Sequence, residues 1–568
     1  MKLIELNASS PTFKPLKFNQ TGLSLILGNK SDSSAGGSNG SGKTLALWLV
    51  HLCLGSTTIS EPIKKHLPEW EFELQFSIRG KKHDVVRSGD GKKIALDGKK
   101  ITFSNYKKWL NEQGIFRLIP DVTTITFRSL FSRFARRGKA DWHYPEKITG
   151  EQDAVAILRT LYLLGEDPSS MLRKMQNKKE IDDINKALKT WKADPALKNL
   201  GYSGLKPQTQ INYLKTQIQK LETDIKNFEI AENYRALETE ANQKTEDIRE
   251  IDKKIAQLSY EKTSIETSLK VEPDISRKEL LKLYEGLEQI FKPEALAHLS
   301  SVEQFHENML TNRRKRLNAD RVRIEAEIQQ HGNSREKFVS EREKILKHLH
   351  GKKALDEYAA VVNQLGILKE QCASLEKFNE IEQELERKKL ELKQRMAADD
   401  ALAAAYKDTN PLSSYNDTYA RLIAQMYSNI ASGLVLENNT GDNSQLRFNF
   451  KVDMEGSESE GLNAARIVSF DWLLFMYGKN HSMNFLWHDS SLFSDNDPGP
   501  RARWFTHALQ ALRNTGKQYI VSLTHENFTS MEEHLDKEIF TKLTEAKIID
   551  LGNANANEKL LGITVAMS

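Results

Sequence analysis

A glycine-rich loop between two apolar segments constrains the fold of this chain more than any other feature. Residues 37–44 read GSNGSGKT and match the pattern G-x-x-x-x-G-K-[ST], while residues 23–27 and 45–50 on either side are largely apolar. Glycines let backbone N–H groups turn inward around a polyphosphate, and the N-terminus of a helix adds partial positive charge. Because the pattern is meaningful only between a strand and a helix, these flanks favour a phosphate-binding loop over an ordinary Gly/Ser-rich loop.

The motif gives each of its residues an expected role. Lys43 is expected to reach the outer phosphates, and the hydroxyl of Thr44 is expected to hold Mg²⁺. The other loop residues are expected to surround the phosphates, chiefly with backbone N–H groups: Gly37, Asn39, Gly40, Ser41 and Gly42. Residues 29–36 are additional to the motif, and we expect them to form a flap beside the nucleotide.

Length and composition narrow the class of protein. The 568 residues allow two or three domains, and the 82 basic and 78 acidic residues neither require nor exclude nucleic acid. Cys53 and Cys372 form no C-x-x-C pair, so neither a disulfide framework nor a zinc site is supported. The longest apolar run, residues 45–54, is too short to span a bilayer, and the N-terminus has no secretory pattern. We therefore predict a cytoplasmic protein that does not contact a membrane.

The middle of the chain has the hydrophobic spacing of a coiled coil. Apolar residues alternate at intervals of three and four over 211–228 and 248–269, and heptads return within 317–385. Such a repeat keeps one narrow apolar stripe facing a partner helix. Pro273 and Pro293 mark a break between the two runs. Two coil runs about such a break favour an antiparallel hairpin.

We predict that this hairpin is inserted into a globular head. Its expected parts are an ascending arm (171–270), a tip (271–300) and a descending arm (301–404), with elbows near 332–334 and Gly351. The head would then combine residues 1–170 with residues 405–568. Two separate helical bundles are the alternative, and the return of globular sequence after the second coil argues against them.

Polar residues follow two apolar segments near the C-terminus. Residues 484–488 lead into Asp489, and residues 519–523 lead into Thr524 and His525. Apolar runs of this length between turns are typical of buried strands. The sequence therefore predicts a carboxylate and an imidazole at the ends of two strands.

Basic residues gather in two places that suit nucleic acid. In the first, residues 126–139 mix aromatic residues with arginines that are candidate phosphate ligands: Arg128, Arg133, Arg136 and Arg137. The alternative is a helix that buries its phenylalanines and leaves the arginines in water. In the second, the predicted descending arm contains the run Arg313, Arg314, Lys315 and Arg316. A charge run on a coil is more often only a solvated face.

The order of these pieces resembles the SMC and RecN group of ATP-binding-cassette proteins. The resemblance implies an α/β ABC-type ATPase head, built from both ends of the chain, with a long antiparallel coiled-coil insertion. It also implies that ATP and Mg²⁺ are bound and that Asp489 supports the metal through water. Ser459 and Gly461 match a degenerate signature that would cap the nucleotide of a second head, and His525 matches the histidine that contacts the γ-phosphate. The implied assembly is a homodimer through the heads.

One residue departs from the family pattern. Ser490 stands where the family places its catalytic glutamate. A serine cannot act as a general base near neutral pH. We therefore expect an ATPase that is slow, that depends on a partner, or that uses His488, His525 or Glu526 instead.

Three short runs indicate a narrower resemblance. HDSSLF (488–493), QYIVSLT (518–524) and FHENMLTNRR (305–314) resemble bacterial SMC-like proteins of multi-component defence systems, including the coiled-coil ATPase subunit of Lamassu. This resemblance implies an ATP-gated sensor of double-stranded DNA from phage or plasmids. Engagement of its heads would control a partner effector nuclease, with a small accessory subunit in the complex.

Two other functions remain open from the sequence. One is a RecN-like ATPase that acts in the repair of DNA double-strand breaks. The other is a coiled-coil scaffold whose nucleotide site is vestigial. Salt-dependent affinity for DNA would separate the scaffold from both ATPases.

Overall fold

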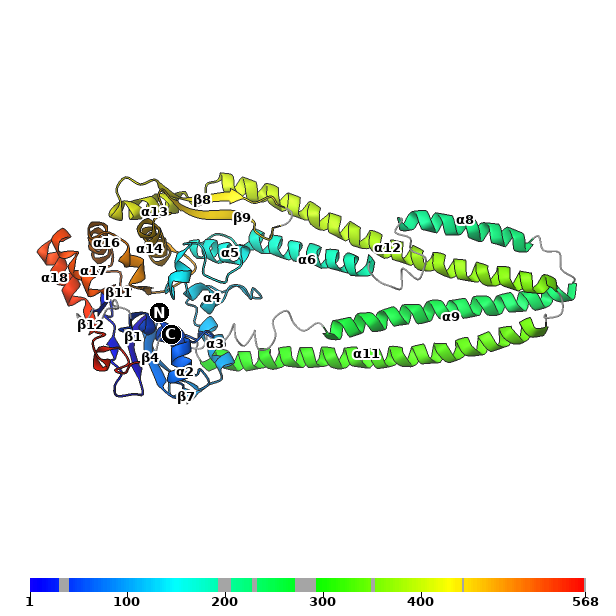
Figure 1. The fold of residues 1–568 in the computed structure, drawn as a ribbon, viewed down its shortest axis with the longest axis horizontal. Helices are drawn as coiled ribbons and strands as arrows, with labels where there is room; N and C mark the ends of the chain where they lie inside the picture. Colours follow the sequence, from blue (N-terminus) through cyan, green and yellow to red (C-terminus); the bar gives the residue numbers. More distant parts are fainter. Residues whose placement is uncertain are drawn as a thin grey trace. The chain divides into compact units, whose positions relative to one another are not determined.

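The computed structural model describes residues 1–29, 40–192, 206–226, 232–270, 293–348, 353–441 and 444–565 (Figure 1). The chain forms two compact units. The head unit includes Met1–Lys178 and Met396–Ser568, and the arm unit comprises Lys179–Asp274 and Val302–Arg395. The predicted architecture, an α/β head made from both ends of the chain with a coiled-coil insertion, is confirmed.

One sheet of the head is antiparallel and comes from the N-terminal part of the chain. Its strand order is β2-β1-β4-β5-β6-β7. The strands are β1 (Lys2–Ala8), β2 (Leu16–Lys17), β4 (Glu71–Ile78), β5 (Lys81–Ser88), β6 (Ile94–Leu96) and β7 (Lys99–Lys100). Alternate residues of β4 are buried, as expected for a sheet with one face on the core.

The second sheet is parallel and joins the two ends of the chain. Its order is β10-β11-β3-β12, so β3 from the N-terminal part lies between two strands from the C-terminal part. The strands are β3 (Gly22–Gly28), β10 (Phe485–His488), β11 (Gln518–Thr524) and β12 (Lys547–Leu551). All three pairings are parallel. Their carboxyl ends therefore meet at one edge, where open α/β sheets bind ligands.

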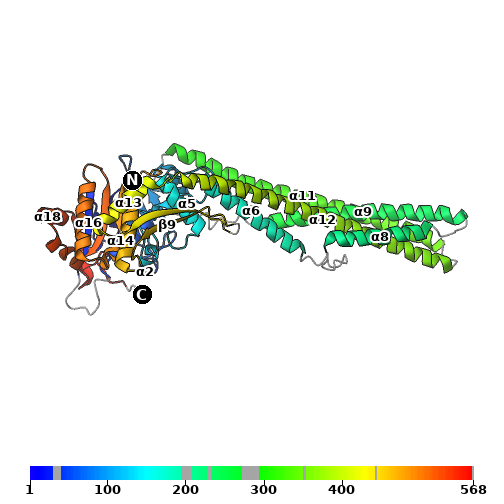
Figure 2. The same cartoon turned by 90° about the horizontal axis from the view of Figure 1, so that it is seen from above.

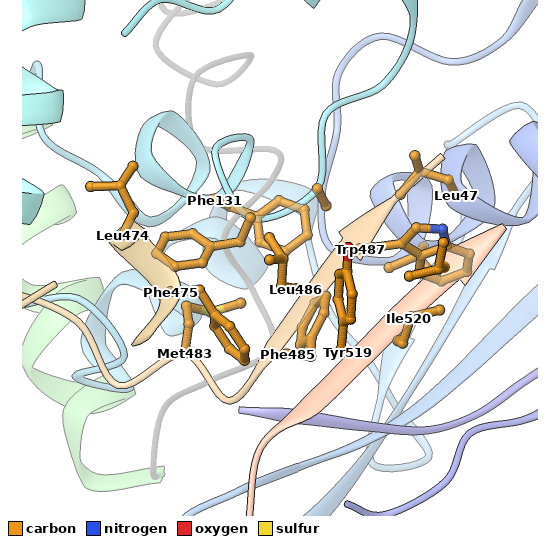
Figure 3. Close-up of a cluster of buried hydrophobic side chains, with 14 of the residues drawn as sticks. Leu47, Phe131, Leu474, Phe475, Met483, Phe485, Leu486, Trp487, Tyr519 and Ile520 are labelled. Atoms are coloured by element: carbon orange, nitrogen blue, oxygen red, sulfur yellow. The ribbon is translucent and has the colours of Figure 1, made fainter. Parts of the chain in front are cut away.

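Helices cover these sheets and complete one hydrophobic core. The N-terminal part contributes α1 (Lys43–Cys53), α2 (Glu61–His66), α3 (Phe103–Glu112), α4 (Phe127–Phe131) and α5 (Asp153–Leu164). The C-terminal part contributes α13 (Ser413–Met426), α14 (Glu460–Tyr477), α15 (Ser491–Ser494), α16 (Pro498–Ala511), α17 (His525–Thr529), α18 (Lys537–Glu545) and the antiparallel pair β8 (Ser432–Asn438) and β9 (Phe448–Met454). Figure 3 shows side chains of α1, α4, α14, β10 and β11 in one cluster, with Trp487 fully buried. Both ends of the chain therefore share one core.

The arm unit consists of long helices whose ion pairs establish their direction (Figures 1 and 2). The helices are α6 (Ser169–Lys192, which begins in the head unit), α8 (Pro207–Lys226), α9 (Glu232–Lys270), α11 (Pro293–His348, which belongs to the arm unit from Val302 on) and α12 (Lys353–Asp408, which ends in the head unit). The pairs between α8 and α12 are Lys215–Glu376 and Glu222–Lys369. Those between α9 and α11 are Lys244–Glu341, Asp252–Arg335 and Lys262–Glu325. Residue numbers rise on one helix as they fall on the other, so both pairings are antiparallel.

One predicted elbow is wrong. Helix α11 continues through residues 332–334 without a break. The hydroxyl of Ser334 donates to the carbonyl of Gln330 at 3.1 Å, a bond that lets serine stay inside a helix. A single glycine costs only about 1 kcal/mol in a helix interior, which a long packed helix tolerates. The second predicted elbow, Gly351, and residues 271–292 of the predicted tip lie outside the described residues.

Candidate functional site

The phosphate-binding loop leads directly into α1. Gly40 and Gly42 have φ values of 98° and 104°, a region that glycine enters without strain. Gly42 is the N-cap of α1, so the first N–H groups of this helix point back toward the loop. The predicted ligands Gly37 and Asn39, together with most of the predicted flap at 29–36, lie outside the described residues.

Lys43 extends from α1 over the end of β3. A Cβ atom added to Gly28 would lie 2.2 Å from Lys43 Nζ, so the ammonium group occupies the space above this glycine. The side chain of Lys43 is nearly buried. Burial lowers its pKa, and the negative charge of Asp489 partly offsets this effect. The loop therefore holds a desolvated cation where the motif predicts a phosphate ligand.

Thr44 and Asp489 meet across the parallel sheet. The Thr44 hydroxyl donates a 2.8 Å hydrogen bond to Asp489 Oδ2, although 445 residues separate the two. Asp489 is only 1% exposed, and its Oδ1 atom has no hydrogen-bond partner among the described residues. Burial raises the pKa of Asp489, while the Thr44 hydroxyl, the Ser490 N–H and Lys43 act in the opposite direction. A buried carboxylate oxygen without a partner fits a ligand position for a hydrated Mg²⁺ ion.

His525 and Glu526 lie beside this site because β11 lies between β10 and β3. Strand β11 ends at Thr524, whose hydroxyl accepts the N–H of Asn527 at 3.1 Å and caps α17. His525 and Glu526 form the exposed first turn of α17. Both residues therefore directly follow a strand end at the ligand edge of the sheet, and their catalytic roles remain predictions.

His488 faces away from the predicted metal site, so its role as an alternative base is wrong. Successive residues of a strand point to opposite faces, and Asp489 points toward Thr44. The His488 ring is buried, with Nδ1 2.8 Å from the Tyr519 hydroxyl and Nε2 3.5 Å from Asp471 Oδ2. Burial lowers the pKa of His488 in spite of Asp471. The residue belongs to the interior of the head.

Ser490 begins a short helical turn after β10. Its backbone is helical and its side chain is 8% exposed. The Ser490 carbonyl accepts a 3.1 Å hydrogen bond from the Ser494 hydroxyl, so the backbone at this position is fixed. This geometry offers no carboxylate at the position where the family resemblance predicts a base.

The predicted signature divides into one exposed and one buried residue. Ser459 is exposed and is the N-cap of α14, with no side-chain hydrogen bond to the helix. Gly461 is buried against the backbone of Asp495, and an added Cβ would lie 2.5 Å from the Asp495 carbonyl oxygen. Close packing within the head is therefore sufficient to explain Gly461. The role of Ser459 in a signature remains a prediction.

The predicted nucleic-acid patch is partly wrong. Arg133 is fully buried and binds Glu151 through two nitrogen atoms, at 2.8 and 3.2 Å. Arg136 is 1% exposed and binds Asp471 in the same two-point manner. These guanidinium groups hold the head together and cannot reach a DNA backbone.

Arg128 and Arg137 are only partly buried, and both guanidinium groups also contact neighbouring side chains. Arg128 hydrogen-bonds to His51 and lies 5.2 Å from the centroid of the Phe131 ring. Arg137 donates to the Ser56 hydroxyl at 3.0 Å and lies 5.2 Å from the centroid of the Trp48 ring. Contact of these two arginines with DNA remains a prediction.

A segment near the C-terminus also borders the phosphate-binding loop. The N–H of Leu560 donates to the carbonyl of Ser41 at 3.0 Å. Sequence reasoning missed this neighbour because residues 559–565 contain no motif, and only the pairing of β12 with β3 brings them to the loop. The return of aliphatic residues at 560–565, after the polar stretch 552–559 that follows the last strand, was the available signal.

Comparison with known proteins finds one matching family and several similar solved structures. Residues 422–565 match a family described as "Uncharacterised protein conserved in bacteria (DUF2326)". Among curated proteins, none is significantly similar. Among solved structures, the Smc head domain with a coiled coil and joint from Pyrococcus yayanosii is similar at 14% identity and a TM-score of 0.33, over 98% of this chain and 96% of that one.

A second similar structure is the Smc head domain with an extended coiled coil bound to the C-terminal domain of ScpA, from Pyrococcus furiosus. Its identity is 12% and its TM-score 0.31, over 94% of this chain and 92% of that one. Among the described residues, no helix is long and apolar enough to cross a membrane.

Proposed function

We propose that this chain is an SMC-like ATPase subunit that binds ATP and Mg²⁺ at the carboxyl edge of its parallel sheet. The observation that carries the proposal is the hydrogen bond between Thr44 and Asp489, beside Lys43, with Asp489 Oδ1 unpartnered among the described residues. These three side chains supply the donor set that an Mg²⁺–triphosphate needs: an ammonium, a hydroxyl and a carboxylate.

Each side chain has a distinct task in this proposal. Lys43 would neutralise phosphate charge, while Thr44 and Asp489 would hold the metal directly or through water. When bound, Mg²⁺ supplies charge neutralisation on the phosphate oxygens. Because Ser490 offers no base, the resting state of this chain would be the ATP-bound one, and hydrolysis would be slow unless His525, Glu526 or a partner assists.

The proposed assembly is a homodimer in which ATP joins two heads. Exposed Ser459 at the start of α14 supports this idea because a helix N-terminus favours a phosphate from a facing copy. Engagement of the heads would control a partner effector nuclease, with a small accessory subunit in the complex.

Double-stranded DNA from phage or plasmids is the proposed trigger. Four consecutive basic side chains on α11 are exposed and support contact with a phosphate backbone: Arg313, Arg314, Lys315 and Arg316. The defence role itself depends on the resemblance of three short sequence runs.

The test measures ATP binding and phage protection in the same variants. Lys43→Ala should abolish ATP binding and protection in cells that carry the complete set of partner genes. Lys65→Ala, which removes an exposed lysine from α2, is the matched control and should change neither. ATP affinity that Lys43→Ala leaves unchanged would overturn the nucleotide assignment. Sensitivity to DNA damage without loss of protection would favour a RecN-like repair function instead.

A further inference from the structure

The segment of residues 559–565, named here the C-terminal strap, runs along the phosphate-binding loop. Besides the bond from Leu560 N to the Ser41 carbonyl, Leu560 lies directly against Gly42, where an added Cβ would be 2.5 Å from Leu560 Cβ. The topology explains this placement. Strand β12 is parallel to β3, so the chain that leaves β12 emerges at the same sheet edge as the loop.

The strap is also fixed on its other side. Its Leu560 carbonyl accepts the N–H of Lys14 at 2.9 Å, and the Leu561 carbonyl accepts the Thr12 hydroxyl at 2.8 Å. Gly562 has a φ of 64°, and an added Cβ would lie 2.1 Å from the Thr12 carbonyl oxygen. A larger residue would therefore push the strap away from Thr12. These contacts hold the strap in place beside the loop.

A pocket of about 120 Å³ lies between the loop and the strap. The loop side is formed by Gly40, Ser41, Gly42 and Leu45, and the strap side by Lys559, Leu560, Leu561, Ile563 and Val565. Five of these residues have aliphatic side chains, while backbone groups, Ser41 and Lys559 make about half of the exposed lining polar.

We propose that this pocket takes the nucleobase of the bound nucleotide. The inference rests on the proposed function, because it requires the triphosphate to bind the loop. A nucleotide whose phosphates lie against Gly40–Gly42 must place its ribose and base close to the loop, and the strap offers aliphatic side chains there, Ile563 and Val565 among them. The flat faces of a purine fit between aliphatic side chains, which remove apolar ring surface from water.

The lining also predicts poor selectivity for the base. A site that hydrogen-bonds a substrate group rejects analogues without it strongly, whereas an apolar pocket discriminates weakly between rings of similar size. The strap contributes aliphatic contacts and one flexible lysine, Lys559, whose Nζ donates to the Thr564 hydroxyl at 3.1 Å. ATP and GTP should therefore bind with affinities within about tenfold of each other.

Calorimetric titration of the full-length protein with ATP, GTP and inorganic tripolyphosphate, each with Mg²⁺, tests the proposal. ATP and GTP should bind at least tenfold more tightly than tripolyphosphate. Ile563→Ser should weaken both nucleotides about fivefold or more and leave tripolyphosphate unchanged, and Ile563→Leu should restore nucleotide binding. Val435→Ser, at an exposed valine of β8, is the matched control and should change none of the three.

Two results would overturn the nucleobase pocket while leaving the phosphate site intact. One is tripolyphosphate binding as tightly as ATP, with both dependent on Lys43. The other is an equal effect of Ile563→Ser on all three ligands. A different result, in which none of the three binds, or in which binding does not depend on Lys43, would refute the proposed nucleotide site itself and the pocket with it.

Discussion

The guanidinium of Arg136 and the carboxylate of Asp471 form a two-point ion pair inside the head, with Nε–Oδ2 at 2.7 Å and the second nitrogen–oxygen distance at 2.8 Å. Both side chains are at most 1% exposed. Asp471 lies in α14, the helix that begins at the predicted signature, and its Oδ2 is 3.5 Å from His488 in β10. The pair therefore joins the segment after α4 to the middle of α14, and Asp471 in turn contacts β10, the strand that precedes Asp489.

Removing one partner of this pair should destabilise the head. Asp471→Asn leaves Arg136 buried without its charge partner, and breaking a buried ion pair costs about 3–5 kcal/mol. Urea unfolding, followed by circular dichroism and tryptophan fluorescence, measures the change. The double variant Arg136→Met/Asp471→Leu should recover part of the loss because it leaves no unpaired charge. Glu538→Gln, which breaks an exposed pair with Lys542, is the control and should have little effect. Asp471→Asn within 0.5 kcal/mol of the parent protein would contradict this account.

The sequence predicted the features that depend on residues close together in the chain. The phosphate-binding loop, the a/d spacing of the arms and the strand before Asp489 each lie within a few residues, so periodicity and motif could find them. The order of these pieces then indicated that both ends of the chain build one head. The pairing of β3 with β11 and β12 realises that prediction.

The sequence could not give the long-range partners of its charged residues. Arg136 and Asp471 are 335 residues apart, so nothing near Arg136 indicated an internal ion pair. Arg133 was misread because its partner Glu151, 18 residues away, lies outside the basic run. His488 was misread because its place next to Asp489 in the sequence did not reveal that its ring faces Tyr519 and Asp471 instead. The C-terminal strap was missed because only the sheet brings it to the loop.

Gly28→Ala should weaken ATP binding and leave the fold intact. The new methyl group would occupy the space of Lys43 Nζ, which is the far end of a flexible side chain and can move away. The fold should therefore persist, while displacement of the ammonium group should weaken ATP binding at least tenfold. Fluorescence titration with an ATP analogue and thermal unfolding check the two halves of this prediction. Gly366→Ala, at an arm glycine with open space around it, is the control for ATP binding. Normal ATP affinity in Gly28→Ala would show that Lys43 does not need this position.

Asp489→Asn should stabilise the ligand-free head near neutral pH and impair Mg²⁺-dependent ATP binding. The native carboxylate is buried with one oxygen unpartnered among the described residues, and such a group costs about 1–3 kcal/mol or more. Burial raises the pKa of Asp489, so the folded state holds its proton to higher pH than the unfolded state. The buried charge therefore lowers the free energy of unfolding fully at pH values above the raised pKa of the folded state. This cost is absent at pH values below the pKa of the unfolded state, which is about 3.9.

Thermal unfolding across pH 4–7 of both proteins, with and without Mg²⁺-ATP, tests this prediction. The stability advantage of Asp489→Asn should shrink as the pH falls toward 4. Mg²⁺-ATP should stabilise the parent protein and have much less effect on the variant. An advantage that is independent of pH would mean that ionisation of Asp489 is not its source.

Ser490→Glu should raise ATP turnover if the missing base limits hydrolysis. Ser490 directly follows Asp489, and its backbone is fixed by the bond from Ser494. A positioned general base contributes about 10²–10⁴-fold, so an increase near a hundredfold is expected in a phosphate-release assay. Ser413→Glu adds the same charge at an exposed position in the first turn of α13 and should not raise turnover. Unchanged turnover in Ser490→Glu would point to His525, Glu526 or a partner as the source of the base.

Charge reversal at Arg313 and Arg316 should weaken DNA binding and reduce its salt dependence. These two arginines are three residues apart on α11, so they share one helix face, whereas four consecutive residues cannot. Each phosphate contact contributes about 0.9 to the slope of log affinity against log salt, so the double variant Arg313→Glu/Arg316→Glu should lower the slope by about 1.8. Fluorescence anisotropy with a labelled duplex at several salt concentrations measures this slope. Lys344→Glu/Lys347→Glu makes the same charge change at the same spacing on α11 and serves as the control. Equal slopes for the two variants would assign the effect to net charge, and an unaltered slope in both would place the DNA elsewhere on the protein.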